Sequence, residues 1–376
     1  MKNVKIYSIQ IHTPQEFNQS SFIITGIREY CRVHQLDCQF KFTLYPKLGR
    51  LITSKNDFKS FPKSPFPKLL YVDIQLISGT TITVGFDLYD LADQFSLYAL
   101  KHCDVVFKRN FESRYINNLP VEYQQKIKAL GLTFRVYDAL ELSKKVYVSS
   151  LIQNSLASLK WDRSIFSRLF NIRKKLKEQI KSIKGQRLIE NYESYAKGTE
   201  NSILFQTRVF PNEHSKDTQQ IHADRYRLIK LLKKEFPDHF KGGFIASPLA
   251  KQNYSDALTN VPSEPQAYLQ AVKAAKIVIY TRGLANSPAW KMAEYLSQGK
   301  VIIAEPLTAE LPVPLEHGRE VLFFKTDDEL VSHINLVLED EQLQEHLSKN
   351  ARLYFEQHVH PVKTIERIFC FTLQHA

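Results

Sequence analysis

The chain has 376 residues, of which 43% are hydrophobic and 24% are charged, proportions that are ordinary for globular proteins. This length corresponds to about two or three domains. No stretch approaches the roughly 18 consecutive apolar residues of a membrane-spanning helix, so the composition excludes a helical integral membrane protein. The formal net charge of +12 at pH 7 favours anionic partners, namely nucleic acid, anionic lipid head groups or phosphorylated substrates.

The N-terminal residues and the cysteines both indicate a cytoplasmic protein. Residues 1–13 have a basic start, but their apolar residues alternate with polar ones, which predicts a strand over Val4–Ile11 and argues against a signal peptide. The four cysteines show no CxxC spacing, so we expect them to be reduced; they are Cys31, Cys38, Cys103 and Cys370.

The first half of the chain predicts an α/β domain without a glycine-rich phosphate loop. Residues 69–76 alternate between apolar and polar, Ser78-Gly79 breaks the pattern, and residues 81–86 resume as a strand, so we expect a half-buried hairpin. The other elements expected here are helix 22–35, helix 90–101, strand 104–107 and strand 133–136.

Residues 160–187 form a strongly basic segment, with ten lysines and arginines against only Asp162 and Glu178. Its apolar residues recur at helical spacing, which predicts an amphipathic cationic helix. Two interpretations stay open. The helix rests on an anionic membrane surface, or it packs its apolar stripe on its own domain while its lysines are solvated.

A second α/β domain is predicted after a linker at residues 195–200. We expect an N-terminal acceptor-binding domain over 1–197 and a donor domain over 198–376, whose last helix can pack back on the first domain. The elements expected in the donor domain are strand 203–207, helix 223–236, strand 243–246, helix 264–273, strand 277–280, strand 301–304, strand 321–324 and helix 329–338.

Two clusters of metal-ligating residue types are expected to be structural. Thr326 followed three residues later by Glu329 is a capping box, so the acids of the Asp327–Glu329 run are predicted in a first helical turn. His358-x-His360 lies beside a proline and is expected where a helix ends. No metal site is therefore predicted.

Residues 277–305 predict a strand, a loop, a helix and a second strand. Ser287 stands where a helix N-cap is expected and Pro288 at the first helical position, while Gly299 ends the helix. The start of this helix faces the carboxyl edge of a parallel sheet, where backbone N–H groups bind phosphate or carboxylate. A nucleotide site is one interpretation, and an α/β unit with nothing bound is the other. The side chains that favour the first are Arg282, Ser287, Lys291 and Glu294.

Several segments of the second half resemble the "glycosyl transferases group 1" family of GT-B glycosyltransferases. They are ILFQTRVFP, GLANSPAWKMAEYLSQGKVIIAEPL, GREVLFFKTDDEL and LSKNARLYFEQHVHP, which together cover roughly residues 200–361. The resemblance implies an α/β fold of two Rossmann-like domains facing a cleft. It also implies transfer of a sugar from a nucleotide-diphosphate sugar to a hydroxyl acceptor in glycan or glycolipid synthesis.

The resemblance also implies roles for individual residues. Glu294 takes the position that binds ribose, and Arg208 takes a diphosphate role in both donor binding and catalysis, helped by Ser287 and Lys291. Arg282 and Gly283 lie in the donor loop. Asn286 stands where the family often has an acid, which leaves a retaining or inverting outcome open. No DxD motif occurs, in keeping with metal-independent transfer without a cofactor, in which protein cations stabilise the leaving diphosphate.

The acceptor side is expected in the first domain. An inverting enzyme needs a base within reach of the acceptor hydroxyl, and Asp87 follows a predicted strand. Asp90 is expected to cap the following helix instead. Lys108 and Arg109 come just after another strand, where they either receive an acidic acceptor or belong to a solvated loop.

Two other functions are weighed against glycosyl transfer. A nucleotide-sugar epimerase of the same architecture needs several acids and histidines in its cleft, and the loop before the helix offers none. A nucleic-acid-binding protein would use the net charge, but the basic segment lacks interleaved aromatic residues beyond Phe166 and Phe170. We therefore expect no nucleic-acid partner, and a cytoplasmic enzyme that is peripheral to the membrane if residues 160–187 bind it.

Overall fold

The structure is a computed structural model. It describes residues 5–14, 17–43, 50–55, 57–60, 68–139, 144–146, 148–149, 152, 173, 187–196, 198–211 and 215–374. The chain divides into two compact units, which are described separately. Unit 1 comprises Met1–Ile189, Ala309–Pro312 and His360–Ala376, and unit 2 comprises Glu190–Thr308 and Val313–Val359. The segment 190–197, predicted at the end of the first domain, thus belongs to unit 2.

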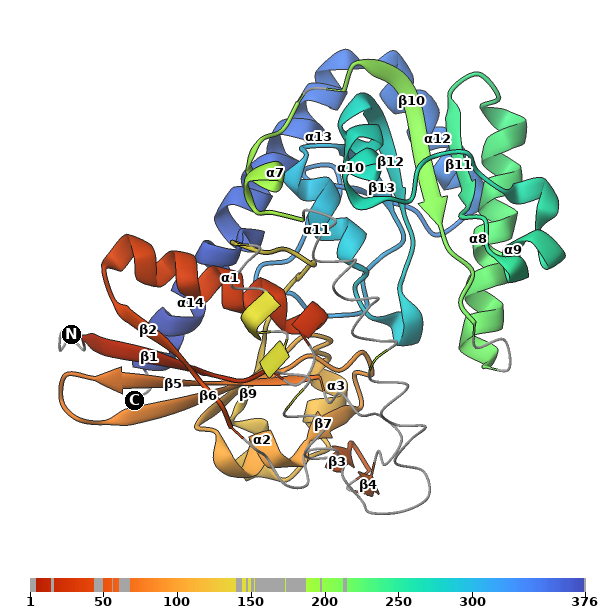
Figure 1. Cartoon of the computed structure of the whole chain (residues 1–376). Coiled ribbons are helices and arrows are strands. Elements are labelled where there is room, and N and C mark those ends of the chain that lie inside the picture. The colour runs from red at the N-terminus through yellow and green to blue at the C-terminus, as the bar shows by residue number, and fades with distance from the viewer. Residues whose placement is uncertain are drawn as a thin grey trace. The chain divides into compact units, whose positions relative to one another are not determined.

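Unit 1 is built on a mixed six-stranded sheet of order β2-β1-β5-β6-β8-β9 (Figure 1). Strand β5 runs antiparallel to both β1 and β6, whereas the other pairs are parallel. The strands are β1 (Ile6–His12), β2 (Asp37–Lys41), β5 (Leu69–Leu76), β6 (Thr81–Asp87), β8 (Val105–Lys108) and β9 (Ile127–Ala129).

The predicted hairpin is present as β5 and β6, and Gly79 in its turn has a φ of +87°. This left-handed conformation is readily available only to glycine, which explains why the apolar pattern breaks there. The expected alternation of exposure holds for Asp73 and Gln75, but Tyr71 is buried. Its ring packs against Tyr98 of the next helix, so part of the hairpin is covered on both faces.

The predictions for residues 90–101 and 133–136 were wrong in part. Residues 94–96 form a strand, and the helix starts only after Ser96, whose Oγ accepts a hydrogen bond from Ala99 N at 3.3 Å. Residues 133–136 form no strand, and β9 takes the sheet edge instead. The elements of this region are β3 (Arg50–Thr53), β4 (Phe58–Ser60), β7 (Gln94–Ser96), α2 (Leu97–His102), α3 (Ser113–Ile116) and α4 (Val121–Gln124).

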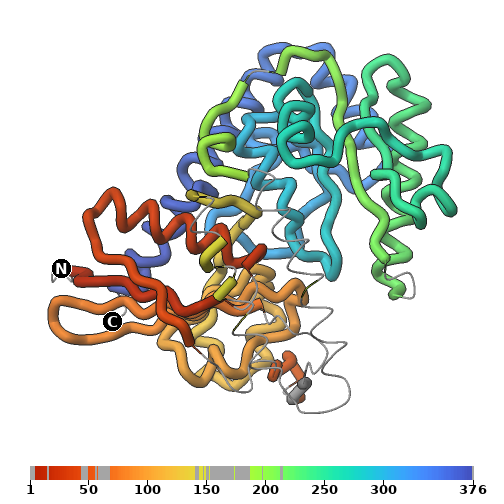
Figure 2. The backbone as a smooth tube through the Cα atoms, in the orientation of Figure 1, coloured from red at the N-terminus to blue at the C-terminus, as the bar shows by residue number. Residues whose placement is uncertain are grey.

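The first and last helices of the chain pack together in unit 1 (Figure 2). They are α1 (Phe17–His34) and α14 (Pro361–Gln374). A Cβ atom on Gly26 of α1 would lie only 2.5 Å from the carbonyl oxygen of Pro361, so this close approach requires glycine. The C-terminal helix thus completes the N-terminal unit.

Unit 2 contains a five-stranded sheet of order β11-β10-β12-β13-β14, in which every pair is parallel. Both faces of such a sheet are normally covered by helices, and its strands are accordingly rich in buried isoleucine and valine. The strands are β10 (Glu200–Thr207), β11 (Phe240–Phe244), β12 (Ala275–Tyr280), β13 (Val301–Ala304) and β14 (Leu322–Phe323).

Helices cover the two faces of this sheet. On one face, apolar residues of α8 and α12 form a core with alternate strand residues such as Ile203 and Ile277. On the other face lie α10 and α11, which are joined by a hydrogen bond between the Tyr268 and Tyr295 hydroxyls. The helices are α7 (Glu190–Glu193), α8 (Lys216–Glu235), α9 (Pro248–Asn253), η1 (Ser255–Ala257), α10 (Pro265–Ala274), η2 (Leu284–Asn286), α11 (Trp290–Ser297), α12 (Asp327–Glu339), α13 (Glu341–Tyr354) and η3 (Phe355–Val359).

The α/β class predicted from the sequence is confirmed. The predicted cap of α12 is also present, because Thr326 Oγ1 accepts from Glu329 N at 3.2 Å and the Glu329 carboxylate accepts from Lys325 N at 2.6 Å. The expected basic helix at 160–187 lies outside the described residues except at Arg173 and Arg187. Among the helices that are described, none is long and apolar enough to cross a membrane.

Candidate functional site

The carboxyl ends of β10, β12 and β13 meet at one edge of the unit 2 sheet. Tyr280 at the end of β12 pairs with Ala304 at the end of β13, and β10 is the other neighbour of β12. From β10 the chain passes to β11 on one side and later returns to β12 on the other, so a topological switch point lies between β10 and β12. Ligands of open α/β sheets bind at such points.

Arg208 is the first residue after β10 and is exposed. Its guanidinium lies 5.1 Å from the centre of the Phe210 ring, in a cation–π contact. The structure therefore places this exposed residue, the predicted diphosphate ligand, at the carboxyl edge of the sheet.

Arg282, two residues after β12, lies at the same edge and is held by acids. Its guanidinium pairs with Asp217 of α8 at 2.6 Å, and its backbone N–H donates to the Glu305 carboxylate at 2.8 Å. The second Asp217 oxygen accepts from Ala285 N at 2.8 Å. Although burial raises the pKa of Asp217, the hydrogen bonds from Ala285 and Arg282 hold it below the usual range. One carboxylate thus occupies two donors of the predicted phosphate loop.

The loop 283–287 is tightly folded. Gly283 N donates to the carbonyl oxygen of Ser287, and a Cβ atom on Gly283 would lie 2.7 Å from that oxygen. Ala285 and Asn286 both have a φ of 55°, in the left-handed region that non-glycine residues seldom adopt. Such conformations cost about 1–3 kcal/mol each and cluster at ligand-binding sites. Asn286 is exposed.

The predicted helix start at Ser287 was wrong. Ser287 Oγ donates to the carbonyl oxygen of Leu284, and the helix α11 begins at Trp290 with Ala289 as its N-cap residue. Ala289 N donates to the Tyr280 hydroxyl at 2.8 Å. The short helix η2 occupies residues where the sequence suggested an open loop, so the Ser-Pro pair extends the loop instead of starting the helix.

Lys291 and Glu294 lie on α11 as predicted. The Lys291 ammonium donates to the carbonyl oxygen of Gln206, near the end of β10, and lies 4.4 Å from the centre of the Tyr268 ring. This contact directs the lysine toward β10. Glu294 is only 5% exposed, in a buried part of the helix.

Arg225 is a residue of this edge that the sequence analysis missed. It lies on α8, is 6% exposed, and donates to Thr281 Oγ1 at 3.3 Å, the Arg208 carbonyl at 3.2 Å and the Arg282 carbonyl at 3.1 Å. Its pKa is lowered to about 10, mainly by burial; the Glu305 carboxylate opposes this shift, and the nearby guanidiniums of Arg208 and Arg282 add to it. A mid-helix arginine at an amphipathic position carries no local sequence signal.

Glu305 follows β13 at the same edge and was also missed. Burial raises its pKa, while the hydrogen bond from Arg282 N opposes this rise. The edge of unit 2 therefore carries four cationic side chains, those of Arg208, Arg225, Arg282 and Lys291.

Asp87 and Lys108 of unit 1 form a buried ion pair. Asp87 is 1% and Lys108 is 0% exposed, and Lys108 Nζ lies 3.4 Å from Asp87 Oδ1. The other Asp87 oxygen accepts from Ser96 N at 2.8 Å, and Lys108 also donates to the Gln94 carbonyl at 2.7 Å. Burial lowers the pKa of Lys108, which the Asp87 charge opposes. This burial contradicts both expected roles, the acceptor base at Asp87 and the acceptor cation at Lys108.

Asp90 and Arg109 of unit 1 likewise pair with each other. Arg109 is 5% exposed and its guanidinium binds Asp90, which also accepts from Lys68. Burial raises the pKa of Asp90, but Arg109 and Lys68 hold it below the usual range. Arg109 is thus neither solvated nor open to an acceptor, and Asp90 is not a helix cap, since Ser96 caps α2.

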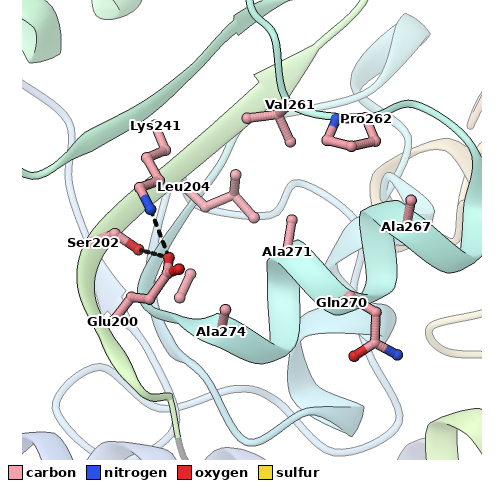
Figure 3. Close-up of a pocket in the computed structure, with 11 residues that line it drawn as sticks. Glu200, Ser202, Leu204, Lys241, Val261, Pro262, Ala267, Gln270, Ala271 and Ala274 are labelled. Atoms are coloured by element: carbon pink, nitrogen blue, oxygen red, sulfur yellow. Dashed lines mark hydrogen bonds and ion pairs between the residues drawn. The ribbon is translucent and has the colours of Figure 1, made fainter.

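The described residues contain no cluster of three histidine, cysteine or acidic side chains that could hold a metal ion. A separate groove of about 380 Å³ lies beside α10 (Figure 3). At one end of it Glu200 pairs with Lys241 at 2.7 Å, and alanines of α10 form one wall. None of the predicted donor residues lines this groove.

The match to a known family lies in the C-terminal half of the chain. Residues 225–369 match a family described as glycosyl transferase-like. This segment is similar to glycosyl transferases. It contains Arg225, the loop after β12 and the helix α11, and it confirms the resemblance for these residues. No curated protein matches the chain.

Solved structures of low similarity accompany the family match. HepE from Anabaena, in complex with UDP, is 12% identical with a TM-score of 0.39, covering 97% of this chain and 98% of HepE. A putative UDP-N-acetylglucosamine 2-epimerase from Listeria monocytogenes is 11% identical with a TM-score of 0.38, covering 97% and 73%.

TarM from S. aureus is 13% identical with a TM-score of 0.35, and the match covers 48% of this chain and 37% of TarM. All three TM-scores lie below 0.5, so no conclusion about activity is drawn from these structures.

Proposed function

We propose that this protein is a glycosyltransferase, which transfers a sugar from a nucleotide-diphosphate sugar to a hydroxyl group of a glycan or lipid-linked acceptor. One observation carries the proposal. Three guanidiniums, those of Arg208, Arg225 and Arg282, lie at the switch point of the parallel sheet, and two of them belong to the glycosyl transferase-like segment.

The cations supply what the departure of a nucleoside diphosphate requires. When the glycosidic bond to the donor breaks, negative charge develops on the diphosphate, and preorganised cations stabilise it more than they stabilise the bound donor. Arg208 and Arg282 serve this purpose, helped by Lys291 of α11, whose ammonium donates to the Gln206 carbonyl oxygen of β10. Protein cations then take the place of a metal ion, so we propose that transfer proceeds in the presence of a metal chelator.

The ribose of the donor is assigned to Glu294. Glu294 lies on α11, the helix that follows the loop with Asn286, and a carboxylate accepts two hydrogen bonds from a ribose diol. Asn286, exposed at the tip of this loop, is available for a hydroxyl of the donor sugar.

A ligand screen tests the donor site. UDP, GDP, ADP, CMP and their sugar conjugates are added separately, and the thermal midpoint is measured. A ligand present at 100 times its Kd stabilises the folded protein by about 2.7 kcal/mol, which gives a clear shift. UDP is included because HepE from Anabaena binds it. If no nucleotide or nucleotide sugar shifts the midpoint, the proposed function is wrong.

A product assay separates glycosyl transfer from its alternatives. The nucleotide sugar found in the screen is incubated with the protein and hydroxyl acceptors in EDTA. Release of nucleoside diphosphate that depends on the acceptor supports transfer. Conversion of the nucleotide sugar to its epimer without acceptor supports the epimerase, and salt-sensitive binding of DNA without nucleotide-sugar affinity supports a nucleic-acid function.

We also propose that the basic segment 160–187 attaches the protein to an anionic membrane surface on the cytoplasmic side. Each cation near such a surface contributes about 1 kcal/mol, so replacing four cations by glutamine lowers partitioning more than a hundredfold. Liposome co-sedimentation compares the wild-type protein with a variant changed at Arg173, Lys174, Lys175 and Lys177. Wild-type protein that stays in the supernatant at low salt contradicts the proposal.

A further inference from the structure

We propose that Arg225 is a positioning residue of the donor site, whose guanidinium ties the loop after β10 to the loop after β12 so that Arg208 and Arg282 act on the same diphosphate. The inference rests on the proposed function, since it takes these two loops to hold a nucleoside diphosphate.

The hydrogen bonds of Arg225 join two loops that the sequence separates by more than seventy residues. One terminal nitrogen donates to the Arg208 carbonyl at 3.2 Å and the other to the Arg282 carbonyl at 3.1 Å, while Nε donates to Thr281 Oγ1 at 3.3 Å. A planar guanidinium with five N–H groups holds three acceptors at fixed directions. The backbone of each cationic residue is thereby set by a single rigid side chain.

A second residue of α8 supports the same loop. His222 lies one turn before Arg225 and accepts a hydrogen bond from Phe210 N at 2.8 Å. The Phe210 ring in turn lies 5.1 Å from the Arg225 guanidinium and 5.1 Å from that of Arg208. Helix α8 therefore holds the loop after β10 through two side chains on one face.

The charge of Arg225 has a consequence for ligand binding. The side chain is buried, and among the described residues no carboxylate forms a salt bridge with it, since its three bonds go to neutral oxygens. Arginine stays protonated at neutral pH. The Glu305 carboxylate stabilises this buried cation, whereas the guanidiniums of Arg208 and Arg282 destabilise it, and an anion bound at the sheet edge relieves the cost of burial.

Two variants at this position separate geometry from charge. Arg225→Lys keeps the charge but loses the planar fork, and Arg225→Met loses both. The matched controls are Arg227→Lys and Arg227→Met, because Arg227 lies on the same helix, is half exposed and pairs with Asp327 of α12. Calorimetry measures the binding of inorganic pyrophosphate and of orthophosphate to each protein, and thermal midpoints record folding.

A diphosphate contacts both loops, whereas a single phosphate needs only one. We therefore expect Arg225→Lys to weaken pyrophosphate binding by about tenfold and orthophosphate binding by about twofold or less, because a point charge replaces a fork. Arg225→Met should weaken pyrophosphate binding by about a hundredfold. The Arg227 variants should match the wild type in both ligands.

The outcomes distinguish this inference from the proposed function. If folded Arg225→Lys binds pyrophosphate as the wild type does, or loses both ligands equally, Arg225 does not position the two loops, although the nucleotide site stands. If wild-type protein binds neither pyrophosphate nor any nucleoside diphosphate, both the proposed function and this inference are wrong. Should Arg225→Met fail to fold, the comparison of Arg225→Lys with Arg227→Lys decides.

Discussion

The six-stranded sheet of unit 1 and the five-stranded sheet of unit 2 both end in charged residues, but the two units use those charges differently. In unit 1, the acids Asp87 and Asp90 pair with Lys108 and Arg109, and all but Asp90 are nearly inaccessible. In unit 2, Arg225 donates to backbone carbonyls and not to acids. A cation matched by an acid is part of the fold, whereas a buried cation such as Arg225, held by neutral oxygens, retains its charge for an anionic ligand.

The largest expected effect is on the stability of unit 1. Asp87→Asn leaves the Lys108 ammonium buried without its partner, and breaking such a pair costs about 3–5 kcal/mol in the free energy of unfolding. Denaturant-induced unfolding measures this loss in the free energy of unfolding. The double variant Asp87→Asn with Lys108→Met should recover part of the loss. Asp37→Asn, at an exposed position of β2, should change stability by about 0.5 kcal/mol or less. A stable Asp87→Asn protein with impaired transfer would return Asp87 to catalysis.

The next effect is on nucleotide binding in unit 2. Glu294→Ala should weaken the binding of the nucleoside diphosphate by about 1.5–3 kcal/mol, the value of a hydrogen bond to a charged group. Titration calorimetry measures the binding of the nucleoside diphosphate and of inorganic pyrophosphate. Pyrophosphate lacks ribose and should bind equally to wild type and variant. Equal weakening of both ligands would mean that Glu294 supports the loop and does not contact ribose.

Arg208→Ala should act mainly on turnover. The charge of this exposed arginine matters most as the diphosphate leaves, so kcat is expected to fall about 10²- to 10³-fold, as for the loss of one donor to a developing anion. Steady-state kinetics separate kcat from KM, and Arg227→Ala on the exposed side of α8 is the control. A variant with full kcat and only a raised KM would contradict this role.

The smallest effect concerns the acid that occupies the phosphate loop. Asp217→Asn keeps an acceptor for Ala285 N but removes the charge that pairs with Arg282, so pyrophosphate should bind about threefold more tightly, in line with the weakness of partly exposed ion pairs. Calorimetry at two salt concentrations measures it. Asp238→Asn, exposed beyond the end of α8, makes the same charge change elsewhere. Weaker binding to Asp217→Asn would show that the carboxylate instead maintains the loop.

Two local patterns were sufficient to locate most elements. Alternation of apolar and polar residues located strands, and capping residues located helix starts. Residues 69–76 and 301–304 were predicted to the residue, because each is bounded by glycine or a change of polarity that acts locally. The start of α11 was not found, since the Ser-Pro pair is used by a loop whose shape depends on Asp217, a residue of another helix. The strand 94–96 was missed because its pairing with β3 is tertiary.

The sequence by itself determined the α/β class, the capping of α12 and the placement of Arg208 and Arg282 at strand ends, because these depend on residues close together in the chain. Only the tertiary structure decided which strand-end charges are neutralised. Asp87 and Lys108 lie twenty-one residues apart and Arg225 lies 57 residues from Arg282, and pairing across such distances depends on strand order and register. Electrostatic partners are set by position in space, and the amino-acid sequence encodes that position only through the whole fold.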